Sequence, residues 1–265
     1  NKQWRDLDEE EQENLCRTVA DEILQENQLG EETSDAYQKA IEQRVQRTLH
    51  VTVDRLVEWS KRSDFDTKYL EQDFGRQGGW NPIRVPLGED RYLRLIGQID
   101  RIDEYTRDDQ TYGMVIDYKS GGAHVTAQDV YYGLKLQLMT YLLALESAYG
   151  KTHGGSMSPA AVVYSYVENP KIPADAPISY EDAVSLANES DAWQNSGYFS
   201  DDIELLTHID NKFLSYGSKR GPYVPIATKK DQTIFSRDLR KVKSTGEFDV
   251  MCRYTNHVMA ETGRH

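Results

Sequence analysis

The sequence predicts an α/β fold built on a mixed sheet of the α+β-like kind. Residues 91–119 contain two strand-like stretches joined by the polar, turn-prone segment 106–111, which is typical of a β-hairpin. Residues 127–149 carry apolar side chains at helical spacing, and residues 159–167, PAAVVYSYV, have the composition of a buried strand. A strand, a helix and a second strand in this order predict a right-handed crossover between parallel strands.

Two amphipathic helices are expected before the sheet. The first covers residues 6–28, with Asp6 as its cap, Glu9 three residues later and Gly30 at its end. The second covers residues 34–61, where apolar side chains recur every three or four residues.

The remaining elements follow from the same patterns. Before the hairpin we expect a strand over residues 66–75, a turn at 78–82 and a strand over 83–87. The crossover helix should begin after Thr126, with Asp129 at its third position, and end before Gly150. Beyond residue 167 we expect a loop over 168–200 with a short helix at 180–189, a strand near 233–234, and a helix over 248–262 that ends at Gly263.

Composition excludes some classes of protein and leaves others open. No apolar run approaches the roughly 20 residues that span a bilayer, and no signal peptide is visible, so no membrane association is expected. The two cysteines, Cys16 and Cys252, form no CxxC pair, which argues against a disulfide framework and favours a cytoplasmic location. The net charge of −13 argues against a tight, independent DNA binder, although residues 212–243 are basic.

The end of the hairpin carries the most informative chemistry. If the strands, residues 91–105 and 113–119, turn at Asp108–Asp109, then Asp100 lies opposite Asp117. Lys119 is two residues further along and shares the face of Asp117. Two facing carboxylates repel, and a hard cation such as Mg²⁺ between them would relieve the repulsion. The alternative is a solvated acid–lysine pair, but the apolar run GMVI before Asp117 argues against an exposed face.

At these residues the chain resembles a known family. GQIDRID at 97–103 and VIDYKSG at 115–121 are similar to the PD-(D/E)XK nuclease superfamily, in its RecB-like branch, and most of all to the nuclease domains of AddB/RexB subunits. The resemblance is strong over residues 71–149. It implies a restriction-endonuclease-like core with added helices at both ends, and a metal-dependent DNA exonuclease that processes double-strand ends for recombinational repair.

The resemblance also assigns roles to single residues. It implies that Asp100 and Asp117, with the main-chain carbonyl of Tyr118, hold Mg²⁺ or Mn²⁺, and that Lys119 positions the attacking water. Gln137 and Tyr141 are four residues apart on one helix face, and they match a Q-x-x-x-Y motif that contacts DNA in this branch. The alternative for this pair is a slightly polar helix face packed on the sheet. Tyr131 and Tyr132 could stack on bases nearby.

Two further residues keep two interpretations each. Glu71 is either a surface residue of an edge strand or a supporting acid of the site. His50 is a lone helical histidine, usually a surface or satisfied core group, and its surroundings do not match the helical histidine of RecB-like nucleases. We therefore expect that the family's histidine lies upstream of residue 1.

The organisation of the chain is predicted on the same basis. We expect a helical segment over residues 1–62, a nuclease core over 63–167, and a continuation of the nuclease domain over 168–265 that is truncated. The iron–sulfur cluster of the AddB subgroup is not supported, because the cysteines lack its spacing. The implied partners are DNA and an AddA/RexA-like subunit. The alternatives are a catalytically weak or inactive DNA-holding module and a stand-alone CRISPR-associated nuclease, whose four-cysteine signature is absent.

Overall fold

The chain divides into two compact units. One comprises Asn1–Arg62 and Val167–Ala192, and the other comprises Ser63–Tyr166 and Trp193–His265. The computed structural model describes residues 4–26, 35–121, 124–152, 157–167, 177–179, 182, 186 and 193–264. Within these residues, none of the helices is both long and apolar enough to cross a membrane.

The first unit contains a short 3₁₀ turn, η1 (Trp4–Asp6), and two packed helices, α1 (Glu9–Glu26) and α2 (Asp35–Arg62). The predicted cap of α1 is wrong by two residues. Asp8 accepts a hydrogen bond from the Glu11 N–H at 2.9 Å, and the Asp8 N–H donates to Glu11 Oε2 at 3.2 Å, so these two residues form the capping box. Gly30, the predicted end of the helix, lies outside the described residues.

The second unit is built on a six-stranded mixed sheet of order β1-β4-β5-β6-β7-β8. The strands are β1 (Asp66–Phe74), β4 (Gly97–Arg107), β5 (Gln110–Lys119), β6 (Met157–Tyr166), β7 (Ser196–Ser200) and β8 (Val242–Lys243). β5 and β6 are parallel, which confirms a crossover between them, whereas β1, β4 and β5 form an antiparallel meander. A separate ribbon consists of β2 (Ile83–Gly88) and β3 (Arg91–Leu95).

The predicted hairpin has the expected turn but a different first strand. Arg107 pairs with Gln110, and the two linking residues, Asp108 and Asp109, have φ of 51° and 63°, as a type I′ turn requires. The expected strand over 91–105 is in fact two strands, since β3 leaves the sheet to pair with β2. β4 starts at Gly97, where a Cβ would lie 2.7 Å from the Phe74 ring, so only glycine allows this close approach.

The crossover contains two helices, α3 (Ala127–Tyr131) and α4 (Gln137–Thr152), where one was expected. The predicted Thr126–Asp129 capping box is confirmed, with the Asp129 N–H donating to Thr126 Oγ1 at 3.1 Å. Gly133 adopts φ +71°, and the next N–H donates to Asp129 O at 2.8 Å, which ends α3. Gly150 lies inside α4 and not beyond its end.

The C-terminal part contains elements that the sequence did not indicate. β7 lies within the expected loop 168–200, α6 (Ile203–Ile209) follows it, and the strand expected near 233–234 is a single bridge between Thr228 and Ile234. Two 3₁₀ turns, η3 (Phe213–Tyr216) and η4 (Ser236–Lys241), precede the last helix, α7 (Thr245–Arg264), which includes Gly263. The helix expected at 180–189 falls almost wholly outside the described residues.

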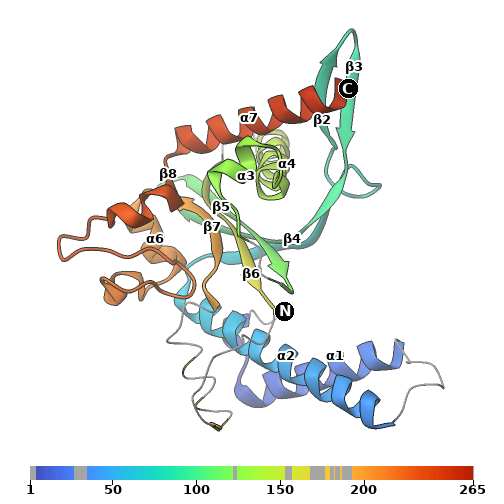
Figure 1. Ribbon diagram of the computed structural model, residues 1–265, viewed down its shortest axis with the longest axis vertical. Coiled ribbons are helices and arrows are strands. Elements are labelled where there is room, and N and C mark those ends of the chain that lie inside the picture. The colour runs from blue at the N-terminus through green and yellow to red at the C-terminus, as the bar shows by residue number, and fades with distance from the viewer. Residues whose placement is uncertain are drawn as a thin grey trace. The chain divides into compact units, whose positions relative to one another are not determined.

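The core of this unit lies between the sheet and its helices. Buried side chains of β5, α4 and α7, among them Val115, Leu142 and Phe248, form one cluster. Figure 1 shows α3, α4 and α7 together on one side of the sheet, with the β2–β3 ribbon beside the end of α7. Since side chains alternate along a strand, Asp117 shares the helix-covered face with Val115.

Candidate active site

The strand registers place three acidic residues in one row across the sheet. Leu70 pairs with Arg101 and Gln72 with Ile99, so Glu71 lies beside Asp100. In the β4–β5 ladder the last pair at this end is Arg101 with Ile116. Asp100 and Asp117 are the next residues on the two strands, so they lie near each other. The predicted hairpin register is thus confirmed as far as the Arg101–Ile116 pair. The charge of Asp100 raises the pKa of both Glu71 and Asp117, after the larger effect of burial.

Asp117 is the buried centre of this row, with 1% of its surface exposed. Its Oδ1 accepts a hydrogen bond from Gln137 Nε2 at 2.9 Å, and its Oδ2 forms an ion pair with the Lys119 ammonium. Burial raises the pKa of the Asp117 carboxyl, Lys119 lowers it, and Asp100 raises it again, with a net shift upward. The Lys119 ammonium also lies 5.3 Å from the centre of the Tyr164 ring on β6.

Asp100 is fastened to the strand that carries the other two residues. Its Oδ2 accepts a hydrogen bond of 2.7 Å from the main-chain N–H of Tyr118, which lies between Asp117 and Lys119. The Tyr118 side chain points to the opposite face, where its hydroxyl accepts from Arg101 Nη1 at 3.4 Å. Arg101 also forms a buried, bidentate pair with Asp103, at 2.7 and 2.6 Å. The Arg101–Asp103 ion pair thus contacts Tyr118 on the face of the sheet opposite the site.

α4 supplies the remaining predicted residues. Gln137 is its first residue, and its Nε2 donates both to Asp117 and, at 2.8 Å, to the Tyr141 hydroxyl. Because Gly133 ends α3, α4 starts afresh at Gln137, whose side chain contacts the Asp117 carboxylate. The side chains of Asp117, Lys119, Gln137 and Tyr141 are therefore linked by direct contacts. Asp100 is linked to the same strand through the main-chain N–H of Tyr118.

These residues fit a hard divalent cation. Both carboxylates offer oxygen ligands, and Asp117 Oδ2 is a buried oxygen that is paired with the Lys119 ammonium. The Asp100 charge that raises the Asp117 pKa is the repulsion that a cation would relieve. Among the described residues no group of three or more His, Cys, Asp or Glu forms a metal-binding cluster.

One part of the surroundings was missed by the sequence analysis. His124 lies in the segment after β5, and its Nδ1 is 3.4 Å from both Ser196 Oγ and the Tyr166 hydroxyl. Tyr166 pairs with Lys119 across β5 and β6, and the Lys135 ammonium donates to the His124 carbonyl. A single histidine beside glycines gives no sequence signal, because its neighbours come from strands far along the chain.

Other candidate residues lie apart from this network. His50, in the first unit, has its Nε2 3.6 Å from Asp54 on the same helix, and its side chain is 47% exposed. Both cysteines are free and buried, Cys16 in α1 and Cys252 in α7, and burial raises the pKa of each thiol. Tyr131 and Tyr132 are 60% and 70% exposed, and the Tyr131 ring stacks on Tyr254 with a centroid distance of 5.4 Å.

Comparisons with known proteins place the chain among nucleases. A family described as the PD-(D/E)XK nuclease superfamily matches residues 1–215. The ATP-dependent helicase/deoxyribonuclease B subunit of Listeria innocua is 31% identical over 267 residues, which cover 99% of this chain and 22% of that protein. The proteins of the same name from Ruminiclostridium cellulolyticum and Clostridioides difficile are 30% and 28% identical, over 80% and 98% of the chain. The chain thus spans about a fifth of the length of these relatives.

Proposed function

We propose that this chain, which belongs to the PD-(D/E)XK nuclease superfamily, is the metal-dependent DNA exonuclease domain of a bacterial helicase–nuclease. The observation that carries the proposal is the contact network of Asp100, Asp117 and Lys119 on two neighbouring strands. The relatives are named as B subunits of ATP-dependent helicase/deoxyribonucleases, which supports the nuclease and its DNA substrate. In this role the domain processes double-strand DNA ends for recombinational repair, in the cytoplasm, together with an AddA/RexA-like partner.

Each residue of the site has a chemical task in this proposal. Asp100, Asp117 and the Tyr118 carbonyl would hold Mg²⁺ or Mn²⁺. Such an ion lowers the pKa of bound water and stabilises negative charge on a phosphate. Lys119, fixed by Asp117 and by the Tyr164 ring, keeps an ammonium beside the scissile phosphate, where it orients the attacking water and offsets the growing charge.

Gln137 and Tyr141 would hold the DNA strand next to this centre. The Tyr141 hydroxyl accepts its hydrogen bond from Gln137, which leaves its own proton free to donate to a phosphate oxygen. The exposed Tyr131 and Tyr132, just before α4, offer ring faces on which unpaired bases could stack.

The rival function is a DNA-holding module without chemistry, and the intact network argues against it. The test is digestion of linear DNA at millimolar Mg²⁺ or Mn²⁺ by the whole chain, beside Asp117→Ala, with DNA binding measured separately in EDTA. We expect cleavage that Asp117→Ala abolishes while its binding persists. Binding without cleavage in the wild type would support the holding module, and cleavage that survives in Asp117→Ala would refute the assigned site.

A further inference from the structure

The basic residues of the chain are concentrated in one segment. Residues 212–243 contain nine lysines and arginines and two aspartates, whereas the whole chain has a net charge of −13. A basic segment in an acidic protein has either a structural use or an anionic ligand. The hydrogen bonds of the segment show which basic side chains have a structural use and which are left to contact a ligand.

Many of these basic side chains hold the segment itself together. Arg220 pairs with both carboxylate oxygens of the buried Asp238, its Nη2 donating to Oδ1 at 2.6 Å and its Nε to Oδ2 at 3.3 Å. Lys241 donates to the Pro225 carbonyl at 2.7 Å, and Lys243 donates to two carbonyls beside it at 2.9 Å. Their positive charges are satisfied within the fold.

Not every basic side chain of the segment is used in this way, since the exposed Lys219 and Arg240 make no hydrogen bond or ion pair through their charged ends within the described part of the chain. The same holds for Lys229 and Lys230, although hydrogen bonds from Thr233, and then the charge of Lys229, lower the pKa of the neighbouring Asp231. Both are exposed, and neither ammonium forms an ion pair within the described part of the chain. They lie on a tight turn in which the Lys229 N–H donates to Thr233 O at 2.8 Å and the Gln232 N–H donates to Lys229 O at 2.9 Å. Asp231 is held by the turn, since its Oδ1 accepts from the Thr233 N–H and hydroxyl at 3.1 and 2.7 Å.

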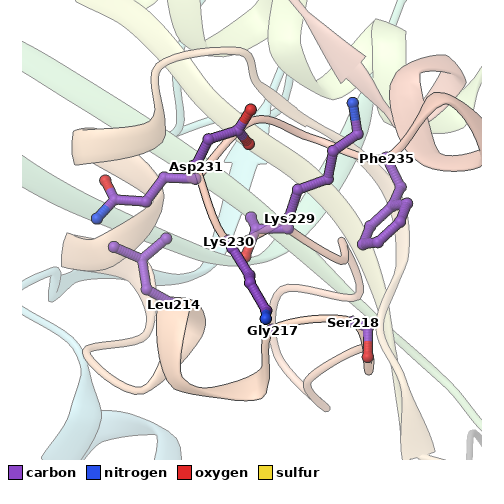
Figure 2. Close-up of a pocket in the computed structure, with 9 residues that line it drawn as sticks. Leu214, Gly217, Ser218, Lys229, Lys230, Asp231 and Phe235 are labelled. Atoms are coloured by element: carbon purple, nitrogen blue, oxygen red, sulfur yellow. The ribbon is translucent and has the colours of Figure 1, made fainter.

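The two lysines border an open cleft of about 770 Å³. Leu214 and Phe235 supply its apolar walls, and Ser218 adds a hydroxyl. Figure 2 shows the two side chains extending in opposite directions, Lys230 toward Gly217 and Lys229 away from it on the side of Phe235, and the Asp231 carboxylate also lines the cleft. A lysine ammonium binds phosphate as a point charge. Two such groups on flexible side chains at a concave surface therefore suit a ligand that contains phosphates.

We propose that this lysine cleft binds the phosphate backbone of DNA, as an anchoring subsite separate from the cleavage residues. The inference rests on the proposed nuclease function, which requires a polyanion to approach a protein of charge −13. A DNA backbone fits better than a small free anion, because the two ammonium groups point apart and can each contact a different phosphate. The cleft therefore adds affinity that is independent of base sequence.

The test measures DNA affinity of the whole chain in EDTA, so that it does not depend on cleavage. Fluorescence anisotropy with a labelled single strand and the matching duplex compares Lys229→Ala/Lys230→Ala with Lys39→Ala/Lys68→Ala, which removes the same charge from exposed lysines elsewhere. We expect the cleft variant to bind DNA roughly two- to thirtyfold more weakly at low salt. The slope of log affinity against log salt should also fall by about 1.4 for the single strand and about 1.8 for the duplex.

Three results would overturn the proposal. Equal losses in both double variants would mean that net charge, and not the cleft, attracts DNA. Unchanged DNA affinity in the cleft variant would exclude the subsite. It would do so even if that variant lost binding to a partner protein, because the cleft would then bind protein and not DNA. Inorganic phosphate that binds the cleft without displacing DNA would identify a small-anion site. Asp117→Ala separates the two proposals, since it should bind DNA normally and cut none. Unchanged thermal unfolding of the variants confirms that they are folded.

Discussion

At the scale of single residues, Lys119 is the side chain whose removal separates chemistry from binding. Its ammonium is paired with Asp117 and lowers the pKa of that carboxyl, so Lys119→Ala removes a positive charge from the site and leaves Asp117 easier to protonate. We expect cleavage to fall by about a hundredfold or more, while DNA binding in EDTA is retained. Digestion rates of linear DNA test this, with Lys68→Ala as a control. A wild-type rate in Lys119→Ala would reject the assignment.

Tyr141 provides a finer test of how the strand is held. Tyr141→Phe keeps the ring and removes only the hydroxyl that accepts from Gln137. If that hydroxyl donates to a phosphate, its loss removes a hydrogen bond to a charged group, which is worth about 1.5–3 kcal/mol. We expect kcat/KM to fall roughly ten- to a hundredfold with thermal stability preserved. A change confined to thermal stability would instead support the packing interpretation of the pair.

Arg101 is predicted to stabilise the site from the opposite face of the sheet. Its side chain and that of Asp103 are 4% and 2% exposed, so Arg101→Leu leaves a buried, unpaired carboxylate. The expected loss is about 3–5 kcal/mol in the free energy of unfolding, measured by urea denaturation. The double variant Arg101→Leu/Asp103→Leu should recover much of this loss. No recovery in the double variant would show that the pair is not what stabilises the strands.

At the scale of elements, features set by a few adjacent residues were predictable, and features set by distant parts of the chain were not. The Asp108–Asp109 turn and the Thr126 cap were confirmed because each depends on a few adjacent residues. The break between α3 and α4 was missed because helical periodicity continues on both sides of Gly133. β7 and β8 contain five and two residues, so pairing with distant strands determines them more than their own composition. The contacts of Asp100, Asp117 and Lys119 followed from the hairpin register, while their catalytic roles remain predictions.

The packing of α4 against α7 carries a predicted pH dependence. Burial, with a contribution from Asp249, raises the pKa of Glu146 from 4.5 to about 7. Between these pH values the native state keeps a proton that the unfolded chain loses, so stability falls as pH rises through this window. Glu146→Gln should therefore stabilise the protein at about pH 8 by up to about 2 kcal/mol, with allowance for partial exposure, and have little effect near pH 4.

Urea denaturation at the two pH values measures the effect of Glu146→Gln. Asp249→Asn serves as the second arm, because it removes the neighbouring charge and should shrink the pH dependence. Equal stabilisation by Glu146→Gln at both pH values would show that ionisation of Glu146 is not the cause.

At the scale of the whole molecule, charge is expected to limit activity more than the catalytic residues do. The net charge of −13 opposes the approach of DNA, and a few lysine contacts are weakened by salt. A site of two carboxylates and a carbonyl also binds Mg²⁺ loosely. We therefore expect the chain alone to digest linear DNA weakly, with KM rising steeply between about 50 and about 200 mM salt while kcat changes little. Initial rates at millimolar Mg²⁺, with Asp117→Ala as the blank, measure both constants. A kcat that falls with salt at constant KM would place the limitation in the catalytic site itself.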